Sequence, residues 1–487
     1  MMKRKLVFFL MLTLLVTSVA GNADAQFWKK KSKRHSHKHK HEENKDQKDE
    51  SNSEPVKEEK TNKKEKKKKE KQDRKKKKQE RKAKKKQGKQ TKEKDVKQVS
   101  VKKNAPEKES VAVVVKKDKK GHTPKKSIYR VDVLAPLYLD ELVKEGAATF
   151  KDKIPDKALP GVAFYAGINI AADSLKKEGF NIDIYVHDVT SFLESPERLT
   201  TLGGLDSSDL IIGAVQPADI SMLAGFAKKN SINFISTMSA SDGGVHDNLY
   251  FTMMQPSLKT HCEWIIDDIT RKFPKQKVSL VYQTKGDMEN TAYNAITDAP
   301  ADNIHFKYLA CNTLPKRANF DLVVDVNKPN VMIISVIDIE FADSILHRLS
   351  REYPATHFEI YGMPSWISIP DLRKEGVFPN LTINITTPFT IDPNTTTGQY
   401  VKHMYKQNYS GKISESVFRG YETMFWYASL LKKYGTHFND KYGENSVPAP
   451  FNQFDIQAAQ DRSGHTLYYE NKHIFLSTYE GGKYKAK

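Results

Sequence analysis

Cysteine is scarce in this sequence. The 487 residues include two cysteines, Cys262 and Cys311, and neither lies near the N-terminus, where a lipid could be attached. In an exported protein the two could form one disulfide, or they could remain two buried thiols, and the sequence leaves both alternatives open. A disulfide is not needed for stability, because roughly 360 residues can bury enough apolar surface for two ordinary domains.

Long apolar runs are also scarce, and the one that stands out is at the N-terminus. Residues 6–19 are almost entirely apolar, follow three basic residues and precede the segment Ala23-Asp24-Ala25. This pattern is typical of a secretory signal peptide. The run has about 14 residues, whereas a membrane-spanning helix needs roughly 20. We therefore expect residues 1–25 to be cleaved, leaving a soluble protein without a lipid anchor that starts near Gln26, in the periplasm or secreted.

Aromatic residues are nearly absent from the next hundred positions, while lysine is abundant. Residues 26–127 contain 41 Lys and Arg against 17 Asp and Glu, and their aromatic residues are Phe27 and Trp28. Such a segment cannot bury enough apolar surface to offset the entropy of ordering it, so we expect it to be disordered and extended. Because the whole chain has a net charge of +20, the remainder, residues 128–487, is mildly acidic.

The basic segment has two main interpretations. It could be a solvated linker, or it could bind anionic envelope material such as lipopolysaccharide, acidic lipid or peptidoglycan. Nucleic acid is not expected as a partner, because export removes the protein from the cytoplasm and the aromatic residues on which single strands stack are missing. His35, His37, His39 and His41 could hold a divalent metal ion, although only weakly on an extended segment.

Motifs of common enzymes are missing. The glycine pairs at 203–204 and 243–244 lack the spacing of a phosphate-binding loop, and there is no Gly-x-Ser-x-Gly hydrolase motif. His187, His246 and His261 are scattered singly, without the spacing of metal ligands. We therefore expect no catalytic activity, no cofactor and no metal in the site.

From residue 128 the sequence changes to short β-branched runs that alternate with helical patterns. Strands are expected at 131–135, 182–186, 210–214 and 232–236 and, after a connection at 253–257, at 278–282, 304–309, 331–335 and 358–361. Helices are expected near 164–175, 261–273 and 417–431, and two late strands near 465–469 and 474–479. This alternation predicts an α/β fold with parallel sheets covered by helices.

The order of these elements and several short segments resemble the type I periplasmic binding proteins, in particular the receptors for leucine, isoleucine and valine. The segments are 129–137 (YRVDVLAPL), 186–188 (VHD), 195–199 (SPERL), 211–218 (IIGAVQPA), 234–240 (FISTMSA) and 250–257 (YFTMMQPS). The likeness covers about residues 129–479. It implies two Rossmann-like lobes joined by a three-segment hinge, with lobe 1 at about 128–252 and 385–447 and lobe 2 at about 255–365 and 450–487. A ligand would lie between the lobes, at the carboxyl ends of both sheets.

The loops that the resemblance assigns to the ligand depart from the family's pattern in lobe 1. Amino-acid receptors of this family place small hydroxyl residues after the third strand and Ser or Thr after the fourth. Here the third-strand loop carries Gln216 instead, and Ala240 stands at the fourth-strand position, flanked by Ser239 and Ser241. The two serines could substitute for the missing hydroxyl.

In lobe 2 the matching loops carry Asp287, Asp338, Ser365 and Trp366. An acidic residue there could meet an ammonium group, and Trp366 could cover an apolar body. The alternative is that these residues lie in exposed loops and bind nothing. The resemblance therefore leaves the ligand class open, with an amino acid or a short peptide as the first choice.

Two functions are compatible with these observations. The first is an exported receptor that captures a small ligand by hinge closure and hands it to an ABC permease or a sensor. The alternative is an envelope-associated scaffold or regulator with a recruited binding fold, which contacts cell-wall material or a protein partner through its basic segment. The missing hydroxyl residues in the expected crevice favour the alternative.

Overall fold

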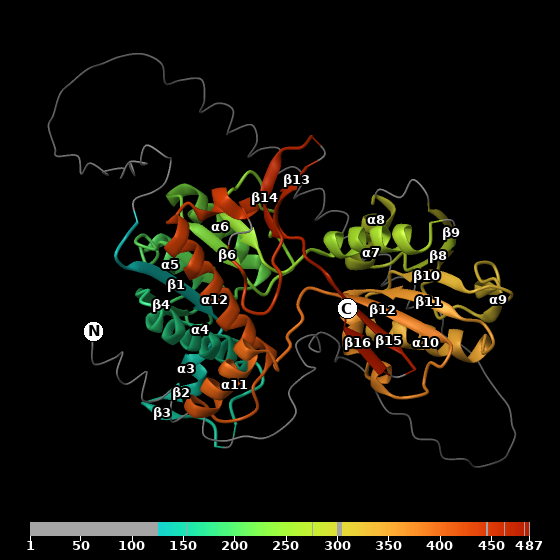
Figure 1. Cartoon of the computed structure of the whole chain (residues 1–487), viewed down its shortest axis with the longest axis horizontal. Helices are drawn as coiled ribbons and strands as arrows, with labels where there is room; N and C mark the ends of the chain where they lie inside the picture. Colours follow the sequence, from blue (N-terminus) through green and yellow to red (C-terminus); the bar gives the residue numbers. More distant parts are fainter. Residues whose placement is uncertain are drawn as a thin grey trace, which may run out of the picture. The chain divides into compact units, whose positions relative to one another are not determined.

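The computed structural model describes residues 125–151, 153–274, 276–299, 304–444, 447–461, 463–481 and 483–486. The predicted signal peptide and nearly all of the predicted disordered basic segment lie outside the described residues. Within the described part, no helix is both long and apolar enough to cross a membrane. These residues form two α/β lobes, each built around one mainly parallel sheet (Figure 1).

The sheet of lobe 1 has the strand order β13-β14-β7-β6-β5-β1-β4. Its strands are β1 (Tyr129–Ala135), β4 (Ile182–Asp188), β5 (Leu210–Gly213), β6 (Asn233–Ser236), β7 (Phe251–Met253), β13 (Ile456–Gln460) and β14 (Thr466–Asn471). Strands β4, β1, β5, β6, β7 and β14 pair in parallel, and β13 is antiparallel to β14. The four strands that the sequence predicts for this lobe are confirmed.

Helices cover both faces of this sheet because side chains alternate along its strands. Val131 and Val133 of β1 pack with α4 (Leu159–Lys177) and α12 (Glu415–Tyr434), whereas Leu134 points to the other face, toward α6 (Pro217–Asn230). Also in this lobe are α5 (Pro196–Thr201), α11 (Thr396–Asn408), η3 (Phe438–Glu444) and the small elements α3 (Leu139–Leu142), β2 (Val143–Lys144) and β3 (Ala147–Ala148).

Helices α4 and α12 approach each other closely through a pair of glycines. A Cβ atom on Gly167 would lie 2.0 Å from the carbonyl oxygen of Val417, and one on Gly420 would lie 2.0 Å from the carbonyl oxygen of Phe164. Only glycine fits at such a distance from another backbone. The pair therefore allows the two helices that cover the sheet to pack backbone against backbone.

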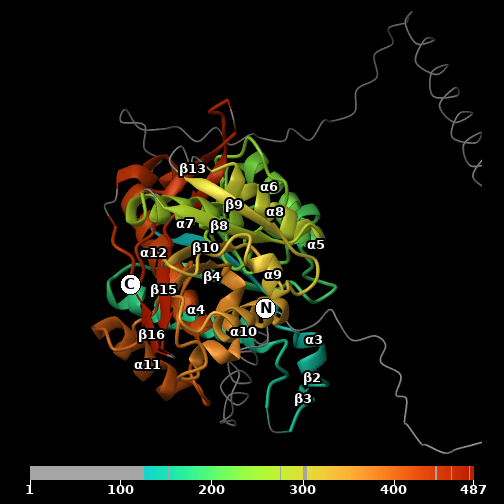
Figure 2. The ribbon, with the colours of Figure 1, turned by 90° about the vertical axis from the view of Figure 1, so that its right-hand side faces the viewer.

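The sheet of lobe 2 has the strand order β16-β15-β12-β11-β10-β8-β9. Its strands are β8 (Lys277–Tyr282), β9 (His305–Ala310), β10 (Asn330–Ile334), β11 (Phe358–Gly362), β12 (Leu381–Thr387), β15 (Phe475–Glu480) and β16 (Lys483–Ala486). Strands β8 to β12 pair in parallel, while β15 and β16 continue the sheet in antiparallel fashion. Figure 2 shows β9 at one edge of this sheet, beside β8.

Helices α7 (Leu258–Lys272) and α8 (Asp287–Thr297) lie on one face of this sheet, and α10 (Ile339–Glu352) lies on the other (Figure 1). The shorter elements are α9 (Arg317–Phe320), η1 (Pro364–Ser368) and η2 (Pro370–Arg373). One continuous apolar cluster, from Cys262 to Tyr479, forms the core.

Cys262 and Cys311 are both buried, and they form no disulfide with each other. The structure therefore has two buried thiols, which is the second of the two alternatives that the sequence left open. Burial raises the pKa of Cys262 to about 12.

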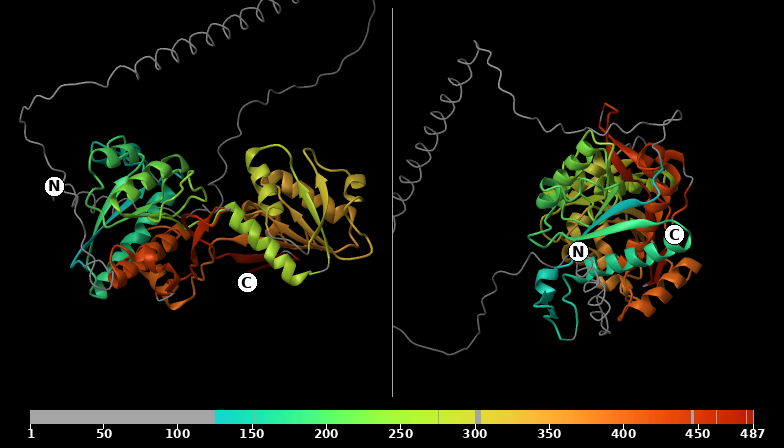
Figure 3. Two further views of the ribbon diagram at one scale, coloured as in Figure 1. Left: turned by 90° about the horizontal axis from the view of Figure 1, so that it is seen from above. Right: turned by 90° about the vertical axis from the view of Figure 1, so that its left-hand side faces the viewer.

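The chain passes between the lobes three times, between β7 and α7, between β12 and α11, and between β14 and β15. The last passage joins β14 to β15, which are among the red strands near the C-terminus in Figure 3. The boundaries differ from the expected ones at two places. Strand β12 stays with lobe 2, because it pairs with β11 up to Ile385. The segment 456–471 belongs to lobe 1, because Tyr469 and Glu470 pair with β7.

Candidate functional site

The loops that follow β1 and β4 meet at the carboxyl edge of the lobe 1 sheet and are fastened by one carboxylate. Asp188, the last residue of β4, accepts hydrogen bonds from the backbone N–H groups of Leu137 at 3.0 Å and Leu139 at 2.7 Å. It also accepts the hydroxyl of Thr190 at 2.5 Å. Because charged acceptors make the stronger hydrogen bonds, Asp188 fixes the shape of this edge.

Tyr138, in the same loop, has a left-handed backbone with φ of 58°. A tyrosine in this region costs roughly 1–2 kcal/mol. Its N–H donates to Thr190 Oγ1 at 2.9 Å, in addition to the longer contact with Asp188. The hydrogen bonds thus hold Tyr138 in a strained conformation, and strain of this kind is often found at functional sites.

The loop after β4 exposes two large apolar side chains at this edge. Phe192 is 75% exposed and Leu193 is 70% exposed. Adjacent exposed apolar side chains offer surface that a ligand or a partner can cover, and contiguous surface of this kind marks many binding sites. Sequence reasoning missed these two residues and Tyr138. Two adjacent apolar residues in a mostly polar loop could have been recognised as a candidate contact surface.

The residues predicted for lobe 1 lie at the same edge, because β5 and β6 are neighbours. Gln216 is exposed where α6 begins, and Ala240 and Ser241 are exposed as well. Ser239 is buried, and its Oγ accepts the N–H of Ser241 at 3.1 Å. The Ser241 hydroxyl in turn accepts the N–H of Gly243 at 3.2 Å. Both hydroxyls are thus already engaged in local turns.

The residues predicted for lobe 2 follow the carboxyl ends of its strands, but Asp338, Ser365 and Trp366 have structural roles. Asp338 caps α10 by accepting the N–H groups of Glu340 and Phe341, each at 3.0 Å. The Ser365 hydroxyl donates to the carbonyl of Ile337 at 2.9 Å. Asp287 is exposed in the first turn of α8.

Trp366 is a core residue, in contrast to the expectation that it covers a ligand. Its side chain is 0% exposed, and its Nε1–H donates to the carbonyl of Val336 at 2.7 Å. The exposed apolar residues at these loops are the neighbours of two predicted residues, Met288 beside Asp287 and Ile367 beside Trp366. They are the better candidates for contact with an apolar ligand.

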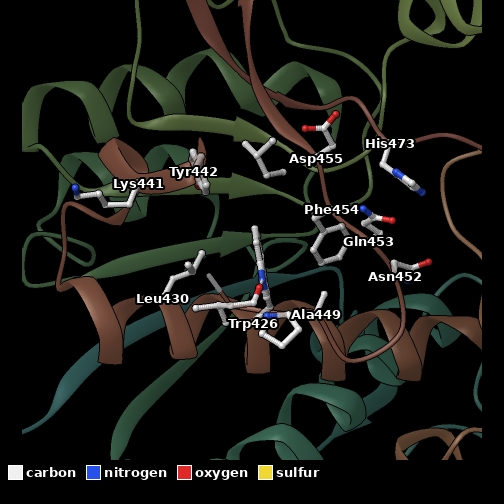
Figure 4. Close-up of a pocket in the computed structure, with 13 residues that line it drawn as sticks. Trp426, Leu430, Lys441, Tyr442, Ala449, Asn452, Gln453, Phe454, Asp455 and His473 are labelled. Carbon is white, nitrogen blue, oxygen red and sulfur yellow. Dashed lines mark hydrogen bonds between the residues drawn. The ribbon is translucent and has the colours of Figure 1, made fainter. Parts of the chain in front are cut away.

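A separate cavity of about 530 Å³ lies within lobe 1, next to the third passage between the lobes. Its volume falls in the range of small-molecule sites. Trp426, Leu430 and Tyr442 contribute apolar surface, and Figure 4 shows Lys441 on one side and Asp455 and His473 on the other. Sequence reasoning missed this cavity. Its lining residues lie close together in the chain, between Trp426 and His473, but only the fold leaves a space between them.

The wall of this cavity is anchored by a buried carboxylate on α12. Glu422 accepts the N–H groups of Phe451 at 2.8 Å and Asn452 at 2.6 Å. Burial raises the pKa of Glu422, while these hydrogen bonds oppose the rise. Trp426 Nε1 adds a hydrogen bond to the carbonyl of Val447 at 2.9 Å. Burial also lowers the pKa of His473, so its imidazole is neutral near pH 7.

A second buried carboxylate ties the first and third passages together. Glu470, at the end of β14, accepts the N–H of Ser257 at 2.7 Å and the hydroxyl of Thr260 at 2.6 Å. Lys472 Nζ lies 2.7 Å from its other oxygen. Burial favours the neutral acid, but Lys472 and the hydrogen bonds outweigh it and lower the pKa of Glu470. The start of α7 is therefore attached to a strand of lobe 1.

Comparisons with known proteins show the fold but no family. No family model matches the chain, and no curated protein matches it. A structure from Rhodospirillum rubrum, provisionally assigned as a branched-chain amino acid ABC transporter, is 10% identical with a TM-score of 0.54, covering 74% of this chain and 99% of the other.

Two further structures are similar at lower TM-scores. An ABC transporter substrate-binding protein from Desulfitobacterium hafniense, in complex with leucine, is 13% identical with a TM-score of 0.48, covering 74% of this chain and 100% of the other. Haemophilus influenzae LpoA is 11% identical with a TM-score of 0.47, covering 74% of this chain and 59% of the other. Together with the sheet order and the three passages, the Rhodospirillum rubrum structure shows that this chain has the two-lobed fold of the type I periplasmic binding proteins.

Proposed function

We propose that the chain is an exported binding protein that captures a small ligand with the carboxyl-edge loops of its two sheets. The observation that carries this proposal is the exposure of Phe192 and Leu193 beside the strained Tyr138, at the sheet edge where open α/β sheets bind ligands. Solvent-exposed apolar side chains at such an edge gain free energy when a ligand removes them from water.

The ligand that fits these loops has an apolar body and a polar end. Phe192, Leu193, Met288 and Ile367 offer apolar surface from both lobes. Polar contacts are available from Gln216 and from backbone N–H groups of the loops. An amino acid with an apolar side chain, or a short peptide, has this chemistry. A permease or sensor would then receive the ligand.

A thermal-shift screen of the full chain against amino acids, short peptides and muropeptides tests the proposal. A ligand at 100 times its dissociation constant adds about 2.7 kcal/mol to the free energy of unfolding. Phe192→Ser should weaken binding of a hit by at least about tenfold, since it removes an apolar contact worth roughly 1.5–3 kcal/mol. Leu322→Ser is the control, because Leu322 is 73% exposed in lobe 2 after α9, away from the edge loops.

Two results would contradict the proposal. In the first, no compound shifts the unfolding transition. In the second, a hit binds equally well to the wild type, to Phe192→Ser and to Leu322→Ser. An additional variant, Ile456→Trp, fills the cavity beside α12. If this variant alone abolishes binding, the ligand occupies the cavity and not the edge loops.

The scaffold function is the second candidate, favoured by the local use of the predicted polar residues. The side chains of three of them already form hydrogen bonds with the backbone, which leaves them less available to a ligand. These residues are Ser239, Asp338 and Ser365. If the basic segment is the working part, the full chain should sediment with anionic vesicles at low salt and be released by about 0.5 M NaCl, where screening is stronger. Equal sedimentation with neutral vesicles would rule out this electrostatic mode.

A further inference from the structure

Lobe 2 contains a cluster of three side chains that the proposed ligand site does not use. Asp343 and His347 stand one turn apart on α10, and Asp371 lies on η2. His347 Nε2 is 2.9 Å from Asp371 Oδ2 and 3.8 Å from Asp343 Oδ2. Within the described part of the chain, this is the one group of three such residues whose ligand atoms all lie within 4.8 Å of one another.

We propose that Asp343, His347 and Asp371 bind a divalent transition-metal ion, with Zn²⁺ as the best fit. In a tetrahedral zinc site with bonds of roughly 2.0–2.1 Å, neighbouring ligand atoms are roughly 3.3 Å apart. The distances from His347 Nε2 to the two carboxylates lie on either side of this value. Small side-chain rotations would therefore bring all three ligand atoms to bonding distance. One imidazole with two carboxylates is also a ligand set that zinc accepts.

The charges of the cluster favour a cation at its centre. Asp343 Oδ1 is shielded from water and has no hydrogen-bond partner among the described residues. The Asp371 carboxylate adds a second negative charge close to it. Lys374 Nζ contacts Asp371 at Oδ1, 2.5 Å away, and leaves Oδ2 directed toward His347. Lys374 is largely exposed, so it can turn toward water when a metal ion binds.

The three ligands stand on fixed parts of the fold. Ile345, Leu346 and Leu349 bury the other face of α10 in the lobe 2 core. Leu372, next to Asp371, is buried in the same core. The His347 ring packs against Phe378 with centroids 4.9 Å apart. A bound ion would link the connection between β11 and β12 to α10, with water completing its coordination, because all three ligands are partly exposed.

A test must separate this cluster from the histidines of the basic segment. His35, His37, His39 and His41 offer a second place for a metal ion. The starting protein is therefore the full chain with these four histidines replaced by asparagine. Zinc binding to it is measured at pH 7.5 by competition with a chromogenic chelator and by isothermal titration calorimetry.

We expect the starting protein to bind one Zn²⁺ per chain. His347→Gln and Asp371→Asn, introduced singly, should each lower the affinity by at least about tenfold, because each removes one of three ligands. His305→Gln and Asp267→Asn are the matched controls, since both residues are exposed in lobe 2 outside the cluster. The controls should bind zinc as the starting protein does.

The proposal is overturned if the starting protein binds no zinc at a stoichiometric level, or if the ligand variants bind it as tightly as the controls. Circular dichroism spectra recorded on every variant guard against misfolding. Because His347 and Asp371 are partly exposed, their substitutions should leave the spectra unchanged. As a second readout, zinc should raise the midpoint of thermal unfolding in the starting protein and in the controls but not in the ligand variants.

Discussion

The two lobes share a plan of parallel strands with helices on both faces and an apolar core, but the polar groups buried beside the core differ. In lobe 1 a buried ionic network spans β1 and β4. Asp132 is bonded to Arg130 Nε at 2.8 Å, to His187 Nε2 at 2.8 Å and to the Ser208 hydroxyl at 2.6 Å. In lobe 2 one continuous apolar cluster fills the core, and Trp366 belongs to it.

The loops at the carboxyl edges of the two sheets are also held in place by different interactions. In lobe 1 the Asp188 carboxylate fixes the loops through charged hydrogen bonds. In lobe 2 the loop after β11 is fixed by the burial of Trp366, and the loop after β10 by the cap that Asp338 provides. Titration of His187 should therefore loosen lobe 1, whereas removal of the Trp366 ring should loosen lobe 2. The predictions below test this contrast, beginning with the largest expected effect.

Trp366→Ala should destabilise lobe 2 by about 3–5 kcal/mol, because it empties a large volume in a packed core. Chemical denaturation measures the loss, and hydrogen exchange locates it. Exchange should accelerate in α10 and β11 and stay unchanged in α4 and α12. Trp366→Phe is the control and should cost less. A loss below about 1 kcal/mol would mean that the ring is not part of the core.

Asp132→Ala should destabilise lobe 1 by about 2–3 kcal/mol, because it removes a charged acceptor and leaves buried donors without a partner. The faster exchange should appear in β1 and β4. Asp183→Ala on β4 is the control, since Asp183 is exposed, and it should be nearly neutral. If the exchange of lobe 2 responds as strongly, the ionic network is not specific to lobe 1.

The stability of lobe 1 should fall at alkaline pH. Burial alone would lower the pKa of His187, but Asp132 and Glu194 raise it to about 9. Because the folded pKa lies above the unfolded value of about 6.5, the stabilisation is complete below pH 6.5 and is lost as the pH rises through 9. The change should be about 2–3 kcal/mol between these limits, because one pKa unit corresponds to about 1.4 kcal/mol. Denaturation of His187→Gln should lack this slope; an unchanged slope would contradict the assignment.

Asp338→Ala should cost about 1 kcal/mol through loss of the helix cap, whereas Asp338→Asn should cost almost nothing, because asparagine caps equally well. Thermal denaturation compares the two. Both variants should bind a ligand from the screen as the wild type does. If Asp338→Asn keeps its stability but weakens ligand binding, then Asp338 contacts the ligand in addition to capping α10.

Much of the fold could be predicted from the sequence, because its elements carry strong local signals. The strands of both lobes follow β-branched runs, and α12 follows the apolar period of Val417, Tyr421 and Met424. The late strands were harder. The two strands are only a few residues apart in the chain, so the sequence suggests that both belong to the same lobe. In the structure β14 pairs with β7 of lobe 1, and β15 pairs with β12 of lobe 2. Which sheet accepts a strand depends on long-range pairing that local patterns do not contain.

The candidate site was predicted at the level of loops but not of side chains. Trp366 and Ile367 are adjacent, and the sequence alone does not say which one points into the core. The cap at Asp338 could have been recognised, because an aspartate directly before a helical pattern is a common start signal. The spacing of Asp343 and His347 was visible too, but Asp371 comes 24 residues after His347, and only the fold brings it to them.

Hydrogen exchange of the full chain, with and without a ligand from the screen, tests most directly whether both sheet edges hold the ligand. The proposed function predicts slower exchange in residues 136–139 and 189–195 of lobe 1, together with residues 286–288 and 364–368 of lobe 2. These four segments carry Tyr138, Phe192, Met288 and Ile367. Protection confined to residues 447–456, around the cavity beside α12, would contradict it and would place the ligand within lobe 1.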